Sequence, residues 1–262
     1  MIRLTSFTRR GLPWLCALAL AHGGALATAA TINVYAAASL TDALQKLAAT
    51  YQGQSGDTLV FNFAASGVLA RQIEAGAPAD LLFFADEAHA DTLEQQGLLL
   101  SGTRRDVLGN SLVIITPPDQ AVMTSPAALT NAVYQHVALG DVKTVPCGAY
   151  AKTYLTQQGL WPAVAPKVVP FDNVRAVLAA VETGNVDAGL VYATDARVSH
   201  RVKVAYAVAP GAGPKIAYPL AVLKAAPEPA AAQRFAAFLQ SDAATTVFKH
   251  YGFLVPPPPA AP

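Results

Sequence analysis

Short apolar runs alternate with segments of helical periodicity along most of this chain. A run such as Leu81–Phe84 suits a buried strand, whereas Leu40, Leu44 and Leu47 recur at the spacing of a helix face. The alternation predicts an α/β fold with mainly parallel sheets flanked by helices. We expect strands at 32–35, 59–63, 81–84, 112–115, 137–139, 168–169, 188–192 and 216–223, and helices at 40–51, 66–75, 149–158, 174–182 and 230–239.

Residues 1–30 have the pattern of an export signal and not of a folded segment. Arg3, Arg9 and Arg10 form a basic start, an apolar run covers 12–21, and small residues at 25–30 offer cleavage sites. The apolar run is shorter than the ~20 residues that a membrane span needs. The sequence therefore predicts a cleaved signal peptide and a periplasmic protein, with the general and the twin-arginine export routes both open.

Charge and cysteine content exclude several classes of protein. Removing three signal arginines changes the basic and acidic counts from 18 and 17 to 15 and 17, which leaves no basic excess for nucleic acid. Cys147 is the only cysteine beyond the signal, so an internal disulfide and a cysteine metal site are both excluded. We expect no cofactor and no nucleic-acid partner.

Two serines stand in the same setting, each after a strand and a run of small residues. Ser39 ends the stretch Ala36–Ser39, and Ser66 follows Ala64 and Ala65. Ligands of open α/β sheets bind beyond the carboxyl ends of the strands, and a helix start there offers unpaired N–H groups to an anion. The alternative is that both serines are plain helix caps, with Asp42 completing a capping box for Ser39. The residues alone leave both interpretations open.

No catalytic motif stands out. Nothing matches the G-x-S-x-G, H-E-x-x-H or P-loop patterns, so we predict binding and not catalysis. The stretch 86–91 contains His89 among acids and could hold a metal, but an acid-rich helix start on a solvated face is the favoured interpretation. Cys147 follows Pro146 in an expected loop and has no histidine nearby, which indicates an inert thiol.

Seven stretches in order make the chain similar to the molybdate-binding proteins of bacterial molybdate ABC importers. The similarity covers nearly all of the chain after the signal, and the order of the stretches is more specific than any one of them. They are V-Y-A-A-A-S-L (34–40), Ser66 with L-A-R-Q-I-E-A-G-A-P-A-D-L (69–81), L-G-N-S-L-V (108–113), V-P-C-G-A-Y-A-K (145–152), D-N-V-R (172–175), G-L-V-Y (189–192) and F-K-H-Y-G-F (248–253).

The resemblance implies a two-lobed periplasmic binding protein fold that holds molybdate or tungstate in the cleft between the lobes. The ligand-binding positions that it implies are Ser39, Ser66, Cys147, Val174 and Tyr192. Molybdenum would be present only within the oxyanion, and the partner would be the membrane permease of an ABC importer. We expect a monomer. A binding protein for another tetrahedral oxyanion, such as sulfate, is the alternative function.

Two positions depart from the family pattern. Cys147 stands where the family usually has Ala, but the family uses the backbone N–H there, so the hydrogen bond is expected to survive. The Ala64–Gly67 loop is poorer in serine than is usual, which leaves Ser66 without neighbouring hydroxyls.

The strand and helix pattern restarts after Gly109 and returns near Tyr218, which predicts two chain crossings that act as a hinge. We therefore expect lobe I to comprise residues 31–108 and 219–255, and lobe II to comprise residues 109–218. Residues 256–262 form a Pro-rich tail.

Overall fold

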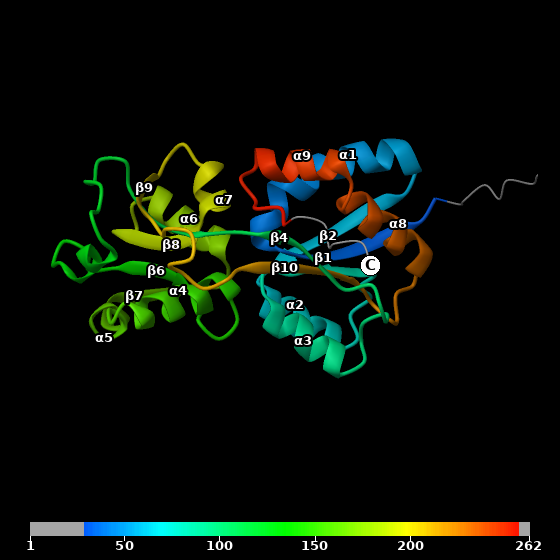
Figure 1. The fold of residues 1–262 in the computed structure, drawn as a ribbon, viewed down its shortest axis with the longest axis horizontal. Helices are drawn as coiled ribbons and strands as arrows, with labels where there is room; N and C mark the ends of the chain where they lie inside the picture. Colours follow the sequence, from blue (N-terminus) through cyan, green and yellow to red (C-terminus); the bar gives the residue numbers. More distant parts are fainter. Residues whose placement is uncertain (1–28, 257–262) are drawn as a thin grey trace, which may run out of the picture.

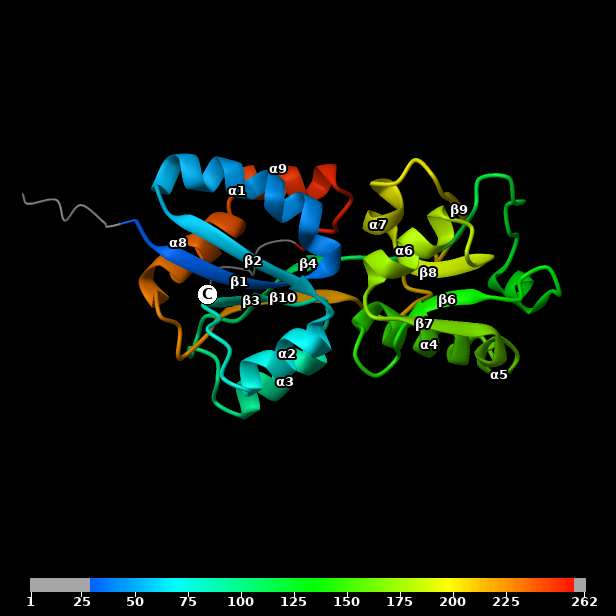
Figure 2. The same ribbon diagram turned by 180° about the vertical axis from the view of Figure 1, so that it is seen from behind.

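A computed structural model describes residues 29–256 of the chain. The expected signal peptide and Pro-rich tail therefore lie outside the described residues, except for their inner ends. Two lobes lie side by side along the longest axis of the molecule, and each is a sheet with helices on both faces (Figures 1 and 2). The expected α/β class with two lobes is confirmed. Among residues 29–256, no helix is long and apolar enough to cross a membrane.

Lobe I is built on a five-stranded sheet with the order β2-β1-β3-β10-β4. Three neighbouring strands are parallel, with Val34 of β1 opposite Phe61 of β2 and Leu81 of β3. Helices α1, α8 and α9 cover one face of this sheet, and α2 and α3 cover the other (Figures 1 and 2). The elements are β1 (Thr31–Ala37), α1 (Thr41–Ser55), β2 (Thr58–Ala64), α2 (Ser66–Glu74), β3 (Leu81–Phe83), α3 (Glu87–Gln95), β4 (Arg105–Gly109), β10 (Ala217–Val222), α8 (Pro229–Leu239) and α9 (Asp242–His250).

Lobe II repeats this plan with the order β7-β6-β8-β5-β9. Its β6, β7 and β8 are parallel, and α6 and α7 lie on the opposite face from α4 and α5 (Figure 1). Strands β5 and β8 are buried at every position, as expected for sheet strands covered on both faces. The elements are β5 (Leu112–Thr116), β6 (Val137–Gly140), α4 (Pro146–Gln157), α5 (Trp161–Val164), β7 (Val168–Phe171), α6 (Val174–Glu182), β8 (Ala188–Tyr192), α7 (Ala193–Arg197) and β9 (Lys203–Ala207), with 3-10 turns at Pro126–Thr130 and Ala165–Lys167.

One strand in each sheet runs against the others, and both of these strands lie next to a chain crossing. In lobe I it is β10, antiparallel to β3 and β4, and in lobe II it is β5, antiparallel to β8 and β9. The chain passes from β4 to β5 through Asn110 and Ser111, and it returns between β9 and β10. Each sheet is therefore mainly parallel, and its reversed strand is one of the two strands from which the chain passes to the other lobe.

Three local expectations were wrong. Ser39 lies in a 3-10 turn at Ala38–Leu40, and α1 starts only at Thr41 without a side-chain cap, so the capping box with Asp42 does not form. Helix α4 starts at Pro146 and not at Ala149, because proline is well suited to the first helical position. Strands β4 and β9 and helix α9 were not expected at all.

Candidate functional site

A small cavity lies between the lobes, where the parallel strands of both sheets end. Its empty space, open mouth included, is about 210 Å³. The lining comes from the segments that follow β1, β2 and β3 in lobe I and β6, β7 and β8 in lobe II, and none of its residues is charged. The structure places all five predicted ligand-binding positions in this lining: Ser39, Ser66, Cys147, Val174 and Tyr192. This is the crevice at the carboxyl ends of strands where α/β proteins bind ligands.

Both serines of lobe I are buried, and neither caps its own helix. The Ser39 hydroxyl lies 3.0 Å from the hydroxyl of Tyr218. Ser66 is the first residue of α2, and its Oγ accepts a hydrogen bond from the Ala85 N–H at 3.0 Å. The interpretation of the two serines as plain helix caps is therefore wrong. Because the Ala85 amide can only donate, the proton of Ser66 stays free for another acceptor.

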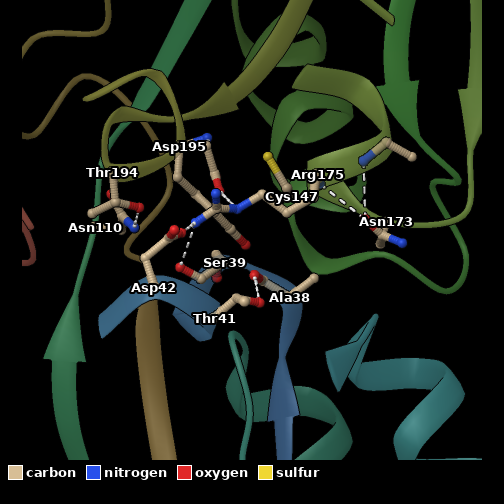
Figure 3. Close-up of polar contacts among 12 residues, drawn as sticks. Ala38, Ser39, Thr41, Asp42, Asn110, Cys147, Asn173, Arg175, Thr194 and Asp195 are labelled. Carbon is tan, nitrogen blue, oxygen red and sulfur yellow. Dashed lines mark hydrogen bonds and ion pairs between the residues drawn. The ribbon is translucent and has the colours of Figure 1, made fainter. Parts of the chain in front are cut away.

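Lobe II contributes the starts of two helices. Cys147 lies in the first turn of α4, and Val174 is the first residue of α6. The first N–H groups of a helix have no partner within it, so these amides are available to a ligand. At α6, the Asn173 Oδ1 accepts the N–H groups of Arg175 and Ala176, at 2.9 and 3.0 Å, and it does not bond the Val174 N–H (Figure 3 shows Asn173 beside Arg175).

Cys147 does not lie in a loop as expected, but its thiol has the inert character that was expected. The side chain is buried, and its Sγ lies 3.7 Å from the carbonyl oxygen of Leu190. Burial raises the pKa of the thiol well above its ordinary value, so the sulfur stays protonated at neutral pH. A buried neutral thiol that faces a carbonyl is not a nucleophile.

Tyr192 closes the cavity from the end of β8. Its side chain is buried, and its hydroxyl has no hydrogen-bond partner within residues 29–256. Burial raises the pKa of this hydroxyl well above its ordinary value, so it remains a proton donor. A buried hydroxyl without a partner costs about 1–3 kcal/mol, so a group that is aimed into a cavity in this state indicates a ligand.

An arginine beside the cavity joins the two lobes. The Arg175 guanidinium of α6 lies 2.8 Å from the Asp195 carboxylate in lobe II and 2.6 Å from the Asp42 carboxylate in lobe I (Figure 3). Its Nη2 also lies 3.4 Å from the carbonyl oxygen of Ser39. Two carboxylates therefore neutralise this cation, and it adds no net positive charge to the site. Nothing in the sequence pairs Arg175 with a carboxylate more than a hundred residues earlier.

The carboxyl of Asp195 is fully buried, and burial raises its pKa to about 6 in spite of the nearby Arg175. A second buried carboxyl, Asp86, pairs with His89 at 2.6 Å, and this contact raises the pKa of the imidazole. The expectation of a solvated face at 86–91 was therefore wrong for Asp86, which is 7% exposed. No group of three or more metal-ligating side chains occurs in the described part of the chain.

The arrangement suits a small anion with several oxygens. Four helix or turn starts, two from each lobe, line the cavity, and the hydroxyls of Ser39, Ser66 and Tyr192 add further donors. A site of neutral donors closed off from water can hold an anion without a lysine or arginine, because hydrogen bonds to charged groups are worth about 1.5–3 kcal/mol each.

Comparison with known proteins places the chain among transport proteins. Residues 32–254 match the family described as bacterial extracellular solute-binding protein. The chain is 38% identical over 240 residues to the molybdate-binding protein ModA of Escherichia coli, which covers 89% of this chain and 92% of that protein.

Two solved structures share the fold. The periplasmic molybdate-binding protein of Azotobacter vinelandii has a TM-score of 0.80 at 23% identity and covers 86% of this chain and 100% of that one. The sulfate-binding protein SubI of Mycobacterium tuberculosis has a TM-score of 0.76 at 17% identity and covers 87% of this chain and 88% of that one. The fold alone thus does not separate molybdate from sulfate. The family match and the E. coli relative show that this chain belongs to the bacterial extracellular solute-binding proteins, in the group that contains ModA.

Proposed function

We propose that this protein captures molybdate or tungstate in the periplasm and delivers it to the membrane permease of an ABC importer. The observation that carries the proposal is the cavity with an uncharged lining, into which donors from both lobes converge. Its relatives named as molybdate-binding proteins support the choice of ligand. The proposal includes binding without catalysis, no cofactor, export by a cleaved signal and a monomer.

The five positions have separate roles in this proposal. Ser39, Ser66 and Tyr192 give hydroxyl donors, whereas Cys147 and Val174 give backbone N–H donors. Selectivity against sulfate would come from size, because donors fixed at rigid helix starts leave a smaller ion under-coordinated. Selectivity against phosphate would come from the shortage of acceptors, because phosphate carries a proton at neutral pH.

Thermal unfolding in the presence of single oxyanions tests the ligand. A ligand at a hundred times its Kd stabilises the protein by about 2.7 kcal/mol, which for a chain of this size raises Tm by roughly 5–10 °C. We expect this rise with molybdate and tungstate and not with sulfate or phosphate at the same concentration. Calorimetric titration then gives the affinities. A rise with sulfate alone would assign the alternative function, and no rise with any oxyanion would refute the proposal.

We also propose that the lobes, 31–108 with 219–255 and 109–218, close on the ligand about a hinge at the two crossings. Support comes from donors on both lobes, since full coordination needs both of them at once. Several contacts already join the lobes, among them the Gly67 N–H bond to the Thr144 carbonyl at 3.1 Å. X-ray scattering should show a smaller radius of gyration with molybdate than without it, and equal curves with binding confirmed separately would contradict the hinge.

A further inference from the structure

A buried chain of hydrogen bonds runs from the first chain crossing to Ser39. Asn110 lies between β4 and β5, Tyr218 lies in β10, and both are buried. The Asn110 Nδ2 lies 3.1 Å from the Tyr218 hydroxyl, which in turn lies 3.0 Å from the Ser39 Oγ. The residues that form this chain are far apart in the sequence and meet where the lobes join.

The direction of each bond follows from the donors available. The Ser111 N–H donates to the other side-chain atom of Asn110 at 2.9 Å, and a backbone amide can only donate. That atom is therefore the carbonyl oxygen Oδ1, and the atom that faces Tyr218 is the NH₂ nitrogen. The Tyr218 oxygen must accept from it. Its second partner, Ser39 Oγ, is the only acceptor for the tyrosine proton among the described residues.

Ser39 consequently accepts from Tyr218, and its own proton is left for a third group. The Ser39 side chain lines the cavity, so the acceptor it can meet there is the ligand. Burial raises the pKa of Tyr218 well above its ordinary value, which keeps the phenol protonated and the direction of the chain fixed at neutral pH. Ser66 is held in the same donor state by the Ala85 N–H, without a side-chain relay.

We infer that Asn110 and Tyr218 are positioning residues, which act through Ser39 by fixing its hydroxyl as a proton donor to the bound oxyanion. The inference rests on the proposed function. An oxyanion without a proton can only accept hydrogen bonds. A serine hydroxyl that is already oriented to donate therefore loses no further rotational freedom when the ion binds. A serine hydroxyl that is free to rotate could also accept a hydrogen bond from a protonated oxyanion, and so would discriminate less between the two kinds of ion.

A double-mutant cycle for molybdate affinity, measured by calorimetry, separates this role from a structural one. The variants are Ser39→Ala, Tyr218→Phe and the double mutant. Phenylalanine keeps the ring, which packs on Phe253 at 5.5 Å and on Tyr192 at 5.9 Å between centroids. Ser39→Ala should weaken binding about ten- to a hundredfold, and Tyr218→Phe about two- to tenfold. In the Ser39→Ala background, Tyr218→Phe should cost nothing further, because the hydroxyl through which it acts is gone.

Thr194→Val is the matched control. Its hydroxyl accepts from the same Asn110 NH₂ group at 2.9 Å and is equally buried, but it is not on the path to Ser39 (Figure 3). We expect its affinity to stay within about twofold of the parent. Asn110→Ala is a second probe of the path, and it too should lose its effect in the Ser39→Ala background.

The outcomes are distinct. If the parent binds molybdate and Tyr218→Phe weakens binding equally with and without Ser39, the positioning role is overturned while the proposed function stands. Full affinity in Tyr218→Phe, or a loss in Thr194→Val as large as that in Tyr218→Phe, also overturns it. A parent that binds neither molybdate nor tungstate overturns the proposed function, and the positioning role with it.

Discussion

Replacing Tyr192 by phenylalanine should change stability and binding in opposite directions. The hydroxyl is buried without a partner in the described part of the protein, and such a group costs about 1–3 kcal/mol. In the proposed open state water would reach it, so we expect the lower end, near 1 kcal/mol, in the ligand-free protein. For a protein of this size, that corresponds to a Tm about 2–4 °C above that of the parent.

Molybdate should reverse this order. If the Tyr192 hydroxyl donates to the dianion, its loss costs about 1.5–3 kcal/mol of binding, or roughly ten- to a hundredfold in Kd. At a fixed molybdate concentration well above both values of Kd, the parent gains about 1.5–3 kcal/mol more from the ligand than the variant does. The parent should then unfold at the higher temperature, although without ligand it unfolds at the lower one.

Thermal unfolding with and without molybdate, together with calorimetric titration, measures both effects. Tyr154→Phe is the control, because Tyr154 is buried in lobe II and does not line the cavity. Unlike Tyr192, its hydroxyl interacts with the side chain of Tyr206, which together with burial raises its pKa. That variant should be less stable in both conditions and bind molybdate like the parent. The reasoning is refuted if Tyr192→Phe binds with parental affinity, or if it is the less stable protein without ligand.

Three further changes test other parts of the site. Cys147→Ala keeps the backbone N–H, so calorimetry should give a molybdate affinity within about twofold of the parent, and a tenfold loss would show that the thiol itself matters. Asp42→Asn removes the lobe I partner of the partly exposed ion pair with Arg175. Stopped-flow release of molybdate should then be about two- to fivefold faster at low salt. An unchanged rate would contradict a role of this ion pair in holding the lobes closed. The pKa of Asp195 is raised from 3.8 to about 6, so the folded protein holds this proton more tightly than the unfolded chain does. The stability that this proton contributes is present below pH 3.8 and is lost as the pH rises through about 6. Measured by urea unfolding, Asp195→Asn should lack this loss of stability with pH. An equal loss in the variant would assign the pH dependence to other groups.

Periodicity predicted the parts of the fold that depend on local sequence. The strand 188–192 and the helix 174–182 were predicted to the residue, because each is a continuous apolar or helix-periodic run between clear turns. Strand β4 was missed because it starts with Arg105 and Asp106, charged residues that suit its position at the edge of the sheet. Helix α9 had a usable signal in Ser241, whose side chain caps it.

The site depended on pairs that local sequence does not encode. The partner of the Ser39 hydroxyl is 179 residues away, at Tyr218, and the partner of Asp42 is Arg175 in the other lobe. Ser39 near a helix start therefore looked like a cap, and only the folded chain shows that its hydroxyl is occupied elsewhere. Of the five predicted ligand-binding positions, Ser39 and Ser66 stood out from their setting after strands, with the capping alternative left open. The other three came only from the family resemblance. The shared place of all five in one cavity is compatible with the prediction, which the proposed titrations test.

Two of the proposed ligand contacts come from backbone N–H groups and not from side chains, which affects how the site can change during evolution. In the proposed site, Cys147 and Val174 offer the ligand a backbone amide, which every residue except proline possesses. Most substitutions there would therefore alter packing and leave the donor in place. Substitutions at such positions should therefore be nearly neutral for binding. A change of ligand would need shifts of whole helix starts, which single substitutions seldom produce. A site of this kind should keep its specificity while its sequence diverges.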